Sequence, residues 1–405
     1  MTPAHGHSGR NTFFAHPFAR PSRTRPGLDS DAMTEKAGVL VHGATGFTGG
    51  LVCELLSTRG ITYAISGRSR ERLERLRKRL EHGGGAPPVE VCVVDLDRTE
   101  TIHAAIDGRT IVLACAGPFA LVGEPILAAC ARLGVHYADT TGEQRFVADA
   151  ARNHQSTCEA SGACIVPAMA YEIAPSDWAC HLAAERVGGA PDTIEVFYSS
   201  KTADGANSSS ATTRGTKKSI LGVLAERAPL QWIDGSLVVE ASAEKTTSFA
   251  LPNGRRLAAA SFPSPEAIVV PLHTGARNVR TYMAMGEGAA RNLHRFRKLA
   301  PAVVRATSSL ARRWLDRGPA GPVGEDRAQT FVIIAEATKG SERARVALAG
   351  SDPYGLTAEL QVYAAQRALA GAITAKGIVG PSVAFPVGDA LVALAHTGLS
   401  LVEPG

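Results

Sequence analysis

The chain has 405 residues, of which 45% are hydrophobic and 20% charged, a composition that can bury a large core and excludes a wholly disordered protein. The net charge of +5 is mild, and most of the excess comes from residues 68–81, where seven basic and three acidic side chains are typical of one surface helix rather than a nucleic-acid-binding face. No uninterrupted apolar run reaches the length of about 18 residues that a transmembrane helix needs.

The cysteine pattern points to a reducing compartment. Seven cysteines occur without a Cys-x-x-C pair, and most lie inside apolar runs. Disulfide frameworks and zinc sites have other spacings. We therefore expect free, buried thiols, no metal site and a cytoplasmic location.

Residues 1–36 are rich in Pro, Gly, Ser, His and Arg and show no periodic hydrophobic spacing. Such a segment buries too little apolar surface to fold, so we interpret it as a disordered tail. It lacks the apolar stretch of a secretory signal, while its arginines leave a transit peptide as an alternative. Met33 leaves open whether residues 1–32 belong to the mature protein.

Residues 37–189 alternate between short apolar runs and segments with helical spacing. This alternation predicts an α/β domain with a doubly wound parallel sheet of the Rossmann type, which binds nucleotides. The predicted strands are 39–42, 63–66, 89–94, 110–114, 136–138 and 164–166. The predicted helices between them are 49–58, 70–80, 99–106, 125–133 and 143–160.

Residues 190–350 are expected to form a second, α+β domain on the substrate side. Strands predicted at 193–200, 236–241, 268–270 and 279–285 lack regular crossover helices, and a hairpin is predicted at 329–336 with 344–349. Residues 351–405 carry helices predicted at 358–374 and 387–396, which we expect to pack back on the Rossmann domain. The second domain is thus inserted before C-terminal helices that return to the first.

The strongest local signal is a glycine-rich turn after the first predicted strand. A strand, a glycine turn and a helix N-terminus form an anion site, because unpaired N–H groups and the helix dipole both face a phosphate. Gly43 permits the tight turn, Gly46 lets the backbone approach a pyrophosphate, and Gly49 lets the helix lie close to the strand. The other residues of this segment that we expect to contact a dinucleotide are Thr45, Phe47 and Thr48.

The end of the second predicted strand favours NADP(H) over NAD(H). An NAD-binding domain normally carries Asp or Glu there, which bonds the ribose hydroxyls. This chain instead has Arg68 and Ser69. Arg68 can pair with a 2′-phosphate in a bidentate way and Ser69 can donate to it. The alternative is that Arg68 only begins a basic surface helix.

The later strand ends supply further candidate cofactor contacts at the carboxyl edge of the sheet, where ligands bind in this fold. Asp95, followed by Leu96, is placed to bond an adenine amino group. Small residues after the fourth strand leave room for a nicotinamide ribose, and a glycine follows the fifth. These contacts are Ala116, Gly117, Pro118, Phe119 and Gly142.

Four of these segments together resemble the saccharopine dehydrogenase-like NADP-binding oxidoreductases, and among them the trans-acting enoyl reductases of actinobacterial polyketide and lipid pathways. The segments are 43–49, 67–69, 116–119 and 137–143. The similarity continues in a segment ending Pro-Ser-Asp at 175–177, in 213–219 and in 352–357. The resemblance implies the two-domain fold, NADP(H) and hydride transfer.

The chain departs from the family pattern at two places near the expected substrate. The family usually has Gly-Phe-Asp-Ser where this chain has residues 170–173, Ala-Tyr-Glu-Ile, and Arg214 replaces the first glycine of Gly-Gly-Thr. These departures leave a different substrate or a changed activity open.

Three residues are candidates for catalysis. Tyr171 is the first candidate for the acid that protonates the reduced substrate, against the alternative of a packing tyrosine near an inter-domain hinge. Thr216 and Lys217 lie where a loop is predicted to enter a helix at 218–225, so they either bind a carboxylate or thioester oxygen or only begin the helix. Asp177 is expected to cap a helix at 175–187.

Two patterns exclude other mechanisms. No tyrosine has a lysine four residues later, so the Tyr-x-x-x-Lys mechanism of short-chain dehydrogenases is absent. No G-x-S-x-G elbow accompanies the serine runs, which disfavours hydrolase chemistry.

Residues 288–317 combine basic and apolar side chains around Pro301. Amphipathic helices with a solvated basic face, docking of an acidic acyl-carrier protein, and contact with a membrane surface are three interpretations of this pattern. A homodimer is a further option for assembly.

Three functional hypotheses follow. The first is NADPH-dependent enoyl reduction of a conjugated, polyketide- or lipid-type intermediate. The second is oxidoreduction of an imine or amino acid, as in saccharopine-type enzymes. The third is an NADP(H) sensor without catalysis, which the departures at 170–174 keep open.

Overall fold

The computed structural model describes residues 36–201, 213–315 and 329–402. The predicted tail therefore lies outside the described residues, apart from Lys36. The described residues between 36 and 402 belong to one compact unit. In the described part of the chain, no helix is long and apolar enough to cross a membrane.

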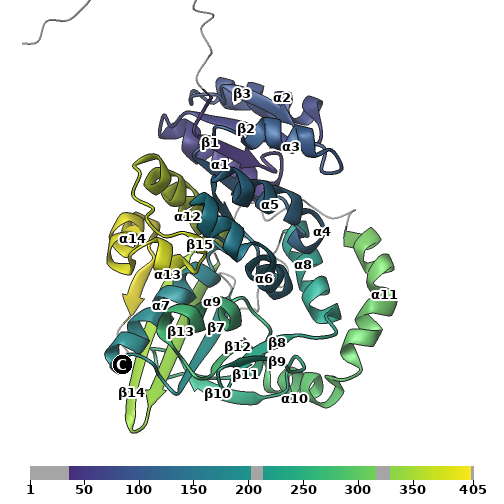
Figure 1. Ribbon diagram of the computed structural model, residues 1–405. Helices are drawn as coiled ribbons and strands as arrows, with labels where there is room; N and C mark the ends of the chain where they lie inside the picture. The colour runs from purple at the N-terminus through teal and green to yellow at the C-terminus, as the bar shows by residue number, and fades with distance from the viewer. Residues whose placement is uncertain (1–35, 202–212, 316–328, 403–405) are drawn as a thin grey trace, which may run out of the picture. The chain divides into compact units, whose positions relative to one another are not determined.

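The first sheet is parallel throughout and runs in the order β15-β6-β5-β4-β1-β2-β3. Its strands β1, β2 and β3 are labelled near the top of Figure 1. Order 3-2-1-4-5-6 is that of a doubly wound dinucleotide-binding fold, so the predicted fold class is confirmed. Every residue is buried in five of these strands, β1, β2, β4, β6 and β15, because helices cover both faces of the sheet. The strands are β1 (Val39–His42), β2 (Tyr63–Gly67), β3 (Glu90–Val93), β4 (Ile111–Ala114), β5 (His136–Asp139), β6 (Cys164–Val166) and β15 (Gly377–Ile378).

The helices between these strands follow the predicted spacing. On α2, only the leucines Leu73, Leu76 and Leu80 are buried, so its basic residues lie on the solvent side. The short helix α4 was not predicted. The helices are α1 (Phe47–Thr58), α2 (Arg70–His82), α3 (Thr99–Ile106), α4 (Phe119–Val122), α5 (Glu124–Leu133) and α6 (Gln144–Ser161).

The second sheet is mixed and has nine strands, seven of them in the order β10-β11-β12-β7-β13-β14-β16, with β8 and β9 paired beside β12. Only β12 and β7 run parallel. The predicted hairpin is confirmed by β13 and β14, whose turn has Gly340 at φ +56°. The strands are β7 (Thr193–Lys201), β8 (Leu230–Ile233), β9 (Ser236–Val239), β10 (Thr246–Ala250), β11 (Arg256–Ser261), β12 (Val279–Met285), β13 (Thr330–Lys339), β14 (Glu342–Ser351) and β16 (Ser400–Val402).

One predicted strand is wrong. Residues 268–270 lie in the helix α9 (Glu266–Thr274), not in a strand. Ile268, Val269 and Val270 are all buried, and a short apolar run of this kind fits a buried helix as well as a strand. The missed strands β10 and β11 pair with each other at the sheet edge, where four of their residues are exposed and the apolar pattern is weak.

The helix α7 (Ile173–Arg186) connects the two sheets along the chain. It begins earlier than predicted, so Asp177 does not cap it. Asp177 accepts instead from Ser382 N at 2.7 Å and pairs with His273 Nε2 at 2.7 Å. These bonds fix α7 to α9 and to α13 (Pro381–Ala384).

The last part of the chain contributes to both sheets, with β15 in the first and β16 in the second. Between them lies α14 (Val387–Leu394). The helix α12 (Pro353–Leu369) packs against α1, β4 and β5 (Figure 1). Gln361 on α12 donates to Asp139 O at 3.0 Å and Met169 O at 2.8 Å, which ties this helix to the ends of two segments of the first sheet.

Candidate functional site

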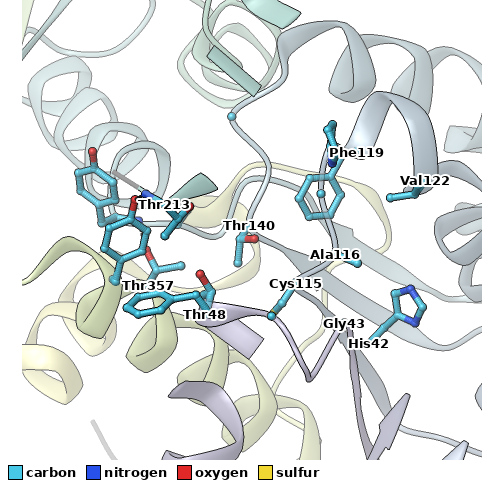
Figure 2. Close-up of a pocket in the computed structure, with 18 of the residues that line it drawn as sticks. His42, Gly43, Thr48, Cys115, Ala116, Phe119, Val122, Thr140, Thr213 and Thr357 are labelled. Atoms are coloured by element: carbon cyan, nitrogen blue, oxygen red, sulfur yellow. Dashed lines mark hydrogen bonds between the residues drawn. The ribbon is translucent and has the colours of Figure 1, made fainter. Parts of the chain in front are cut away.

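A cavity of about 990 Å³ lies at the carboxyl edge of the first sheet and extends to residues of the second. Its size suits a dinucleotide with part of a substrate. In Figure 2, His42 and Gly43 lie on one side of the view and Thr213 and Thr357 on the other, with Thr140 between them. Segments far apart in the sequence therefore form one continuous wall.

The glycine turn is folded as its spacing predicts. Gly43 has φ +77°, and a Cβ there would lie 2.7 Å from Ala116 Cβ. Gly46 N donates to Gly43 O at 2.9 Å, which closes the turn. A Cβ on Gly49 would lie 2.4 Å from Gly43 O, so only glycine lets α1 approach β1 this closely.

The start of α1 has the character of a phosphate site. Gly46 offers no side-chain cap, and the first turn carries no acidic residue. The N–H groups at a helix start need partners, and the helix dipole favours an anion there. Gly43, Thr45, Gly46, Phe47 and Thr48 all line the cavity, so this turn fits a dinucleotide pyrophosphate. Gly49 lies behind them and supports the turn without lining the cavity.

The predicted 2′-phosphate contacts Arg68 and Ser69 also line the cavity. Arg68 is exposed at the end of β2. Ser69 Oγ accepts from Arg72 N at 3.4 Å and caps α2, and its hydroxyl proton is left to donate. Arg72, which the sequence analysis missed, lines the cavity too and adds a second exposed cation. The sequence signal that could have identified Arg72 is the recurrence of cationic residues after the end of the strand.

Of the two cofactor contacts predicted after the third strand, Leu96 lines the cavity, whereas Asp95, the predicted adenine contact, does not. Asp95 is exposed, and its Oδ1 accepts from Asp97 N at 3.1 Å, so the carboxylate stabilises its own turn. Nothing in this geometry brings Asp95 into the cavity wall. Its role toward adenine therefore stays a prediction.

The segment after β4 lines the cavity with Ala116, Gly117, Pro118 and Phe119, and Gly142 joins it from beyond β5. Glu143 fixes this segment, because its carboxylate accepts from Phe119 N at 2.8 Å and Ala120 N at 2.9 Å. The start of α4 is thereby occupied by a protein carboxylate. A phosphate is accordingly left to the start of α1.

His42 lines the cavity at the end of β1 and was not identified from the sequence. Its Nδ1 lies 3.0 Å from Ser66 Oγ. Burial lowers the pKa of His42 to about 4, so the ring is neutral at physiological pH. A neutral imidazole can bond a ligand without changing the charge of the site.

Tyr171 and Glu172 form a hydrogen-bonded pair in the cavity wall. Tyr171 Oη donates to Glu172 Oε1 at 2.6 Å, and its ring packs edge-on against Phe331. Tyr171 N donates to Thr357 Oγ1 at 3.2 Å. Burial raises the pKa of Tyr171 well above its usual value and also raises that of Glu172. Both groups therefore favour their protonated forms.

Thr216 and Lys217 are placed differently from the prediction. The helix α8 spans Arg214–Ala225, so both residues lie within its first turns rather than before it. Lys217 N donates to Thr213 O at 2.9 Å, as in a helix. Lys217 is half-buried and does not line the cavity, whereas Val223 of the same helix does. The side chain of Thr216 lies outside the described residues.

The wall opposite the glycine turn combines apolar and aromatic side chains with uncharged polar ones. Phe262 and Met283 come from the second sheet and its flank, and Val223 comes from α8. Tyr354 on α12 packs edge-on against Phe47 with ring centroids 5.3 Å apart, and its oxygen accepts from Thr213 N at 2.7 Å. Polar residues complete this wall: Ser200, Thr213, Gln329 and Thr357.

A comparison with family models supports the nucleotide assignment. Residues 39–166 match the model of the saccharopine dehydrogenase NADP binding domain. These residues hold β1 to β6 and the whole glycine turn. The cofactor that fits this domain is NADP(H), as the absence of a carboxylate and the presence of Arg68 at the end of β2 predict.

Curated relatives include a "Trans-acting enoyl reductase" of Mycobacterium leprae, 38% identical over 141 residues, and one of Mycobacterium tuberculosis, 36% identical over 141 residues. Each match covers 34% of this chain and 33% of the relative, so the chain spans about a third of the length of these proteins. The likeness of the later segments at 175–177, 213–219 and 352–357 stays a prediction.

A solved structure extends the likeness of fold to most of the chain. The saccharopine dehydrogenase (L-Glu forming) of Saccharomyces cerevisiae superposes with a TM-score of 0.59 at 12% identity, covering 90% of this chain and 98% of that one. The two-domain arrangement of a parallel and a mixed sheet is thus shared. At this identity the likeness concerns the fold.

Proposed function

We propose that this chain, which carries the NADP-binding domain of the saccharopine dehydrogenase family, is an NADPH-dependent oxidoreductase that reduces a conjugated C=C bond of a polyketide- or lipid-type substrate. The observation that carries the proposal is the single cavity that joins the glycine turn to Tyr171, Glu172 and the apolar wall. A cofactor and an apolar acceptor can lie side by side in it.

NADPH, when bound, supplies a hydride to the electron-poor carbon of the acceptor. The residues of the chain have the remaining tasks. The turn from Gly43 to Thr48 and the cation of Arg68 hold and orient the phosphates. The apolar wall excludes water and aligns the acceptor. Tyr171 stands ready to donate a proton to the carbanion or enolate that hydride addition creates.

Thr216 and Lys217 remain candidates for binding a carboxylate or thioester oxygen of the substrate. Support for that role is limited to their place at the start of α8, whose residue Val223 lines the cavity. For Lys217 to contact the substrate directly, its side chain has to turn toward the cavity. Tyr171 therefore stands ahead of both as the group that acts on the substrate.

The second candidate function, reduction of an imine or amino acid, is favoured by the fold shared with a saccharopine dehydrogenase. An amino-acid substrate calls for cations that bind its carboxylate. Among the described residues of the cavity wall, the arginines are Arg68 and Arg72, both on the cofactor side. The enoyl hypothesis fits this wall better. A sensor without catalysis is the third hypothesis.

A carrier-bound substrate is part of the proposal. The helix α10 (Glu287–Phe296) and the turn after it expose Arg291, Arg295 and Lys298 beside Phe296 and Leu299, which are 51% and 63% exposed. The next helix, α11 (Ala300–Leu315), packs against α8, which reaches the cavity. An acidic acyl-carrier protein fits such a surface. A cytoplasmic location and a homodimer also remain proposals.

The test is to measure the Kd of NADPH and of NADH by fluorescence and then to follow NADPH oxidation with enoyl thioesters and with cyclic imines. Oxidation with enoyl thioesters alone supports the proposal, whereas oxidation with imines alone replaces it by the second candidate. Tight NADPH binding without oxidation by either class, with free or carrier-bound thioesters, favours the sensor. Stronger binding of NADH contradicts the role of Arg68.

A further inference from the structure

A buried histidine in the cavity wall has no task in holding the phosphates. His42 is the last residue of β1, is 5% exposed, and lines the cavity directly before Gly43. In the register of the first sheet it lies opposite Ser66 of β2, so both side chains stand on the same face of the sheet. Figure 2 shows His42 on the side of the view that also holds Ala116 and Val122.

The hydrogen bonds around His42 indicate where its proton lies. Nδ1 lies 3.0 Å from Ser66 Oγ, and this is the only side-chain hydrogen bond of either residue in the described part of the chain. Ser66 is completely buried, so its hydroxyl proton has no acceptor there other than Nδ1. Buried donors are left unpaired more rarely than buried acceptors, so Ser66 donates to Nδ1. Burial lowers the pKa of His42 to about 4, and the neutral ring therefore carries its single proton on Nε2.

The Nε2–H group of His42 opens to the cavity. Among the described residues Nε2 has no hydrogen-bond partner, and it is not enclosed in the way that partnerless buried atoms such as His273 Nδ1 are. Since His42 lines the cavity, this nitrogen faces it. Buried polar groups are hydrogen-bonded as a rule, so an almost completely buried donor that faces a cavity calls for an acceptor on the ligand.

The position of this donor relative to Arg68 identifies the part of the ligand. In the first sheet, β1 and β3 both flank β2. His42 ends β1, Arg68 follows β2 and Leu96 follows β3, and all three line the cavity. In NADP(H), the 2′-phosphate and the adenine base are attached to adjacent carbons of one ribose. If Arg68 holds that phosphate, the base lies beside it, at the ends of the neighbouring strands.

Adenine suits this part of the wall. Its ring nitrogens accept hydrogen bonds, and His42 supplies a donor. Leu96 and Val122 supply half-buried aliphatic side chains against which a flat base can pack. Asp95, the contact predicted for the adenine amino group, does not line the cavity. Because the donor is neutral, it adds no charge that competes with Arg68 for the phosphate.

We propose that His42 donates from Nε2 to a ring nitrogen of the adenine base of NADP(H), and that Ser66 holds the imidazole in the required tautomer. His42 is then a further cofactor-binding residue, and Ser66 is a positioning residue that acts through it. The inference rests on the proposed function for its cofactor alone, because it concerns the binding of the nucleotide and not the hydride acceptor.

Three nucleotides separate the base from the phosphates. NADPH, NADH and adenosine 2′-monophosphate are titrated against the parent and against His42→Phe, which keeps a flat ring but removes the donor. NADH lacks the 2′-phosphate and adenosine 2′-monophosphate lacks the pyrophosphate, so adenosine is the part that all three share. We expect His42→Phe to raise the Kd of all three by about 3- to 10-fold.

Other patterns of loss overturn the inference. A loss confined to NADPH and adenosine 2′-monophosphate assigns His42 to the 2′-phosphate, and a loss confined to the two dinucleotides assigns it to the pyrophosphate. Unchanged Kd values show that His42 makes no contact with the nucleotide. The control is His82→Phe, which changes an exposed histidine of α2 outside the cavity wall and should leave every Kd unchanged. Circular dichroism confirms that each variant is folded.

Two further variants test the donor and its orientation. The amide nitrogen of a glutamine can take the place of Nε2, so His42→Gln should give Kd values between those of the parent and His42→Phe. Ser66→Ala releases the tautomer and should raise each Kd by about 2-fold. Equal Kd values in His42→Gln and His42→Phe would mean that packing of the ring, and not a donated proton, binds the nucleotide.

Nitrogen spectra locate the proton directly. In protein labelled with ¹⁵N-histidine, the His42 signals are those that His42→Phe removes. We expect the proton of the free protein on Nε2, and we expect the Nε2–H signal to shift with adenosine 2′-monophosphate but not with inorganic phosphate. A proton on Nδ1 with Nε2 bare, or an equal shift with inorganic phosphate, overturns the inference.

The two proposals fail in different ways. Weaker binding of all three nucleotides by His42→Phe, without oxidation of NADPH by any enoyl thioester in the parent, supports the adenine contact and contradicts the proposed function. Oxidation of NADPH by an enoyl thioester, with unchanged Kd values in His42→Phe, supports the proposed function and overturns the adenine contact.

Discussion

The glycine turn after β1 and the apolar wall opposite it border the same cavity, but the sequence encodes them in different ways. The turn is contained in seven consecutive residues, from Gly43 to Gly49, and its contacts are made largely within those residues and with neighbouring strands. The opposite wall takes Val223, Phe262 and Met283 from separate elements, and Tyr354 from the C-terminal part of the chain.

This difference follows from the physics of each region. A phosphate is held by backbone N–H groups, which require a particular backbone path and therefore particular glycines. An apolar acceptor is held by shape and exclusion of water, which many side chains can provide. The cofactor side is thus recognisable in the sequence, and the substrate side emerges from tertiary packing.

The largest effect is expected at the most constrained glycine. Gly49→Ala places a Cβ 2.4 Å from Gly43 O and 2.9 Å from Ala44 Cα, and neither backbone atom can move without opening the turn. We expect a loss of about 3 kcal/mol in the free energy of unfolding, together with loss of NADPH binding. Chemical denaturation and fluorescence titration measure the two effects.

The adjacent glycine provides a matched control. A Cβ on Gly50 meets only Arg79 Nη2 at 3.5 Å and Ala44 O at 4.0 Å, which are ordinary contacts. Gly50→Ala is therefore expected to be neutral or stabilising by up to about 1 kcal/mol, because alanine favours the helix. Equal effects of the two substitutions would contradict the close-approach explanation.

The next effect concerns the cofactor specificity of Arg68. In the proposed role of Arg68, Arg68→Ala removes a charge-assisted contact to the 2′-phosphate, a loss of about 1.5–3 kcal/mol, so the Kd of NADPH should rise by about 10- to 100-fold while that of NADH is unchanged. Arg75→Ala, which changes an exposed arginine of the following helix α2 that pairs with Glu71, is the control. An equal rise for both nucleotides would show that Arg68 does not read the 2′-phosphate.

The sequence predicted the first sheet well because its signals are local. Six parallel strands, their crossover helices and the glycine turn follow from apolar runs and glycine spacing. Glu143 shows the limit of such signals. Its carboxylate accepts from Ala120 N at the start of α4, which lies 23 residues earlier in the sequence. A sequence motif does not indicate which end of a helix a carboxylate reaches.

The second sheet was less predictable for the same reason. Residues 268–270 have the β-branched character of a strand, yet they lie in the helix α9, because a short buried apolar run does not by itself distinguish the two structures. Lys217 was expected at a helix entrance facing the ligand, but α8 begins earlier and its rotation directs Val223 rather than Lys217 to the cavity. Glu172 was visible only as a departure until its contact with Tyr171 gave it a partner.

A smaller effect is expected at Gln144, which joins helix α6 of the first domain to β8 and to the segment before α9. Gln144 on α6 donates from Nε2 to Leu230 O at 2.7 Å and to Ser264 O at 2.9 Å, and its Oε1 accepts from Leu230 N at 2.8 Å. Gln144→Ala leaves these buried backbone groups without that partner. We expect a loss of about 2 kcal/mol in the free energy of unfolding. Arg145→Ala, its exposed neighbour, should change stability by less than about 0.5 kcal/mol.

The smallest effect is expected at the ion pair between Arg59 and Glu359. Arg59 Nη2 lies 2.6 Å from Glu359 Oε2, and their side chains are 28% and 12% exposed. The pair joins α1 of the cofactor side to α12, so it tests whether charge fixes the returning helix. A double-mutant cycle with Arg59→Met and Glu359→Gln should give a coupling of about 0.5–1 kcal/mol that falls with added salt. His396 Nε2 lies 3.3 Å from Glu359 Oε2, so the cycle is measured in a His396→Asn background. A coupling above about 2 kcal/mol would mean that this pair, rather than the apolar packing of α12 and the bonds of Gln361, holds the C-terminal part of the cavity wall in place.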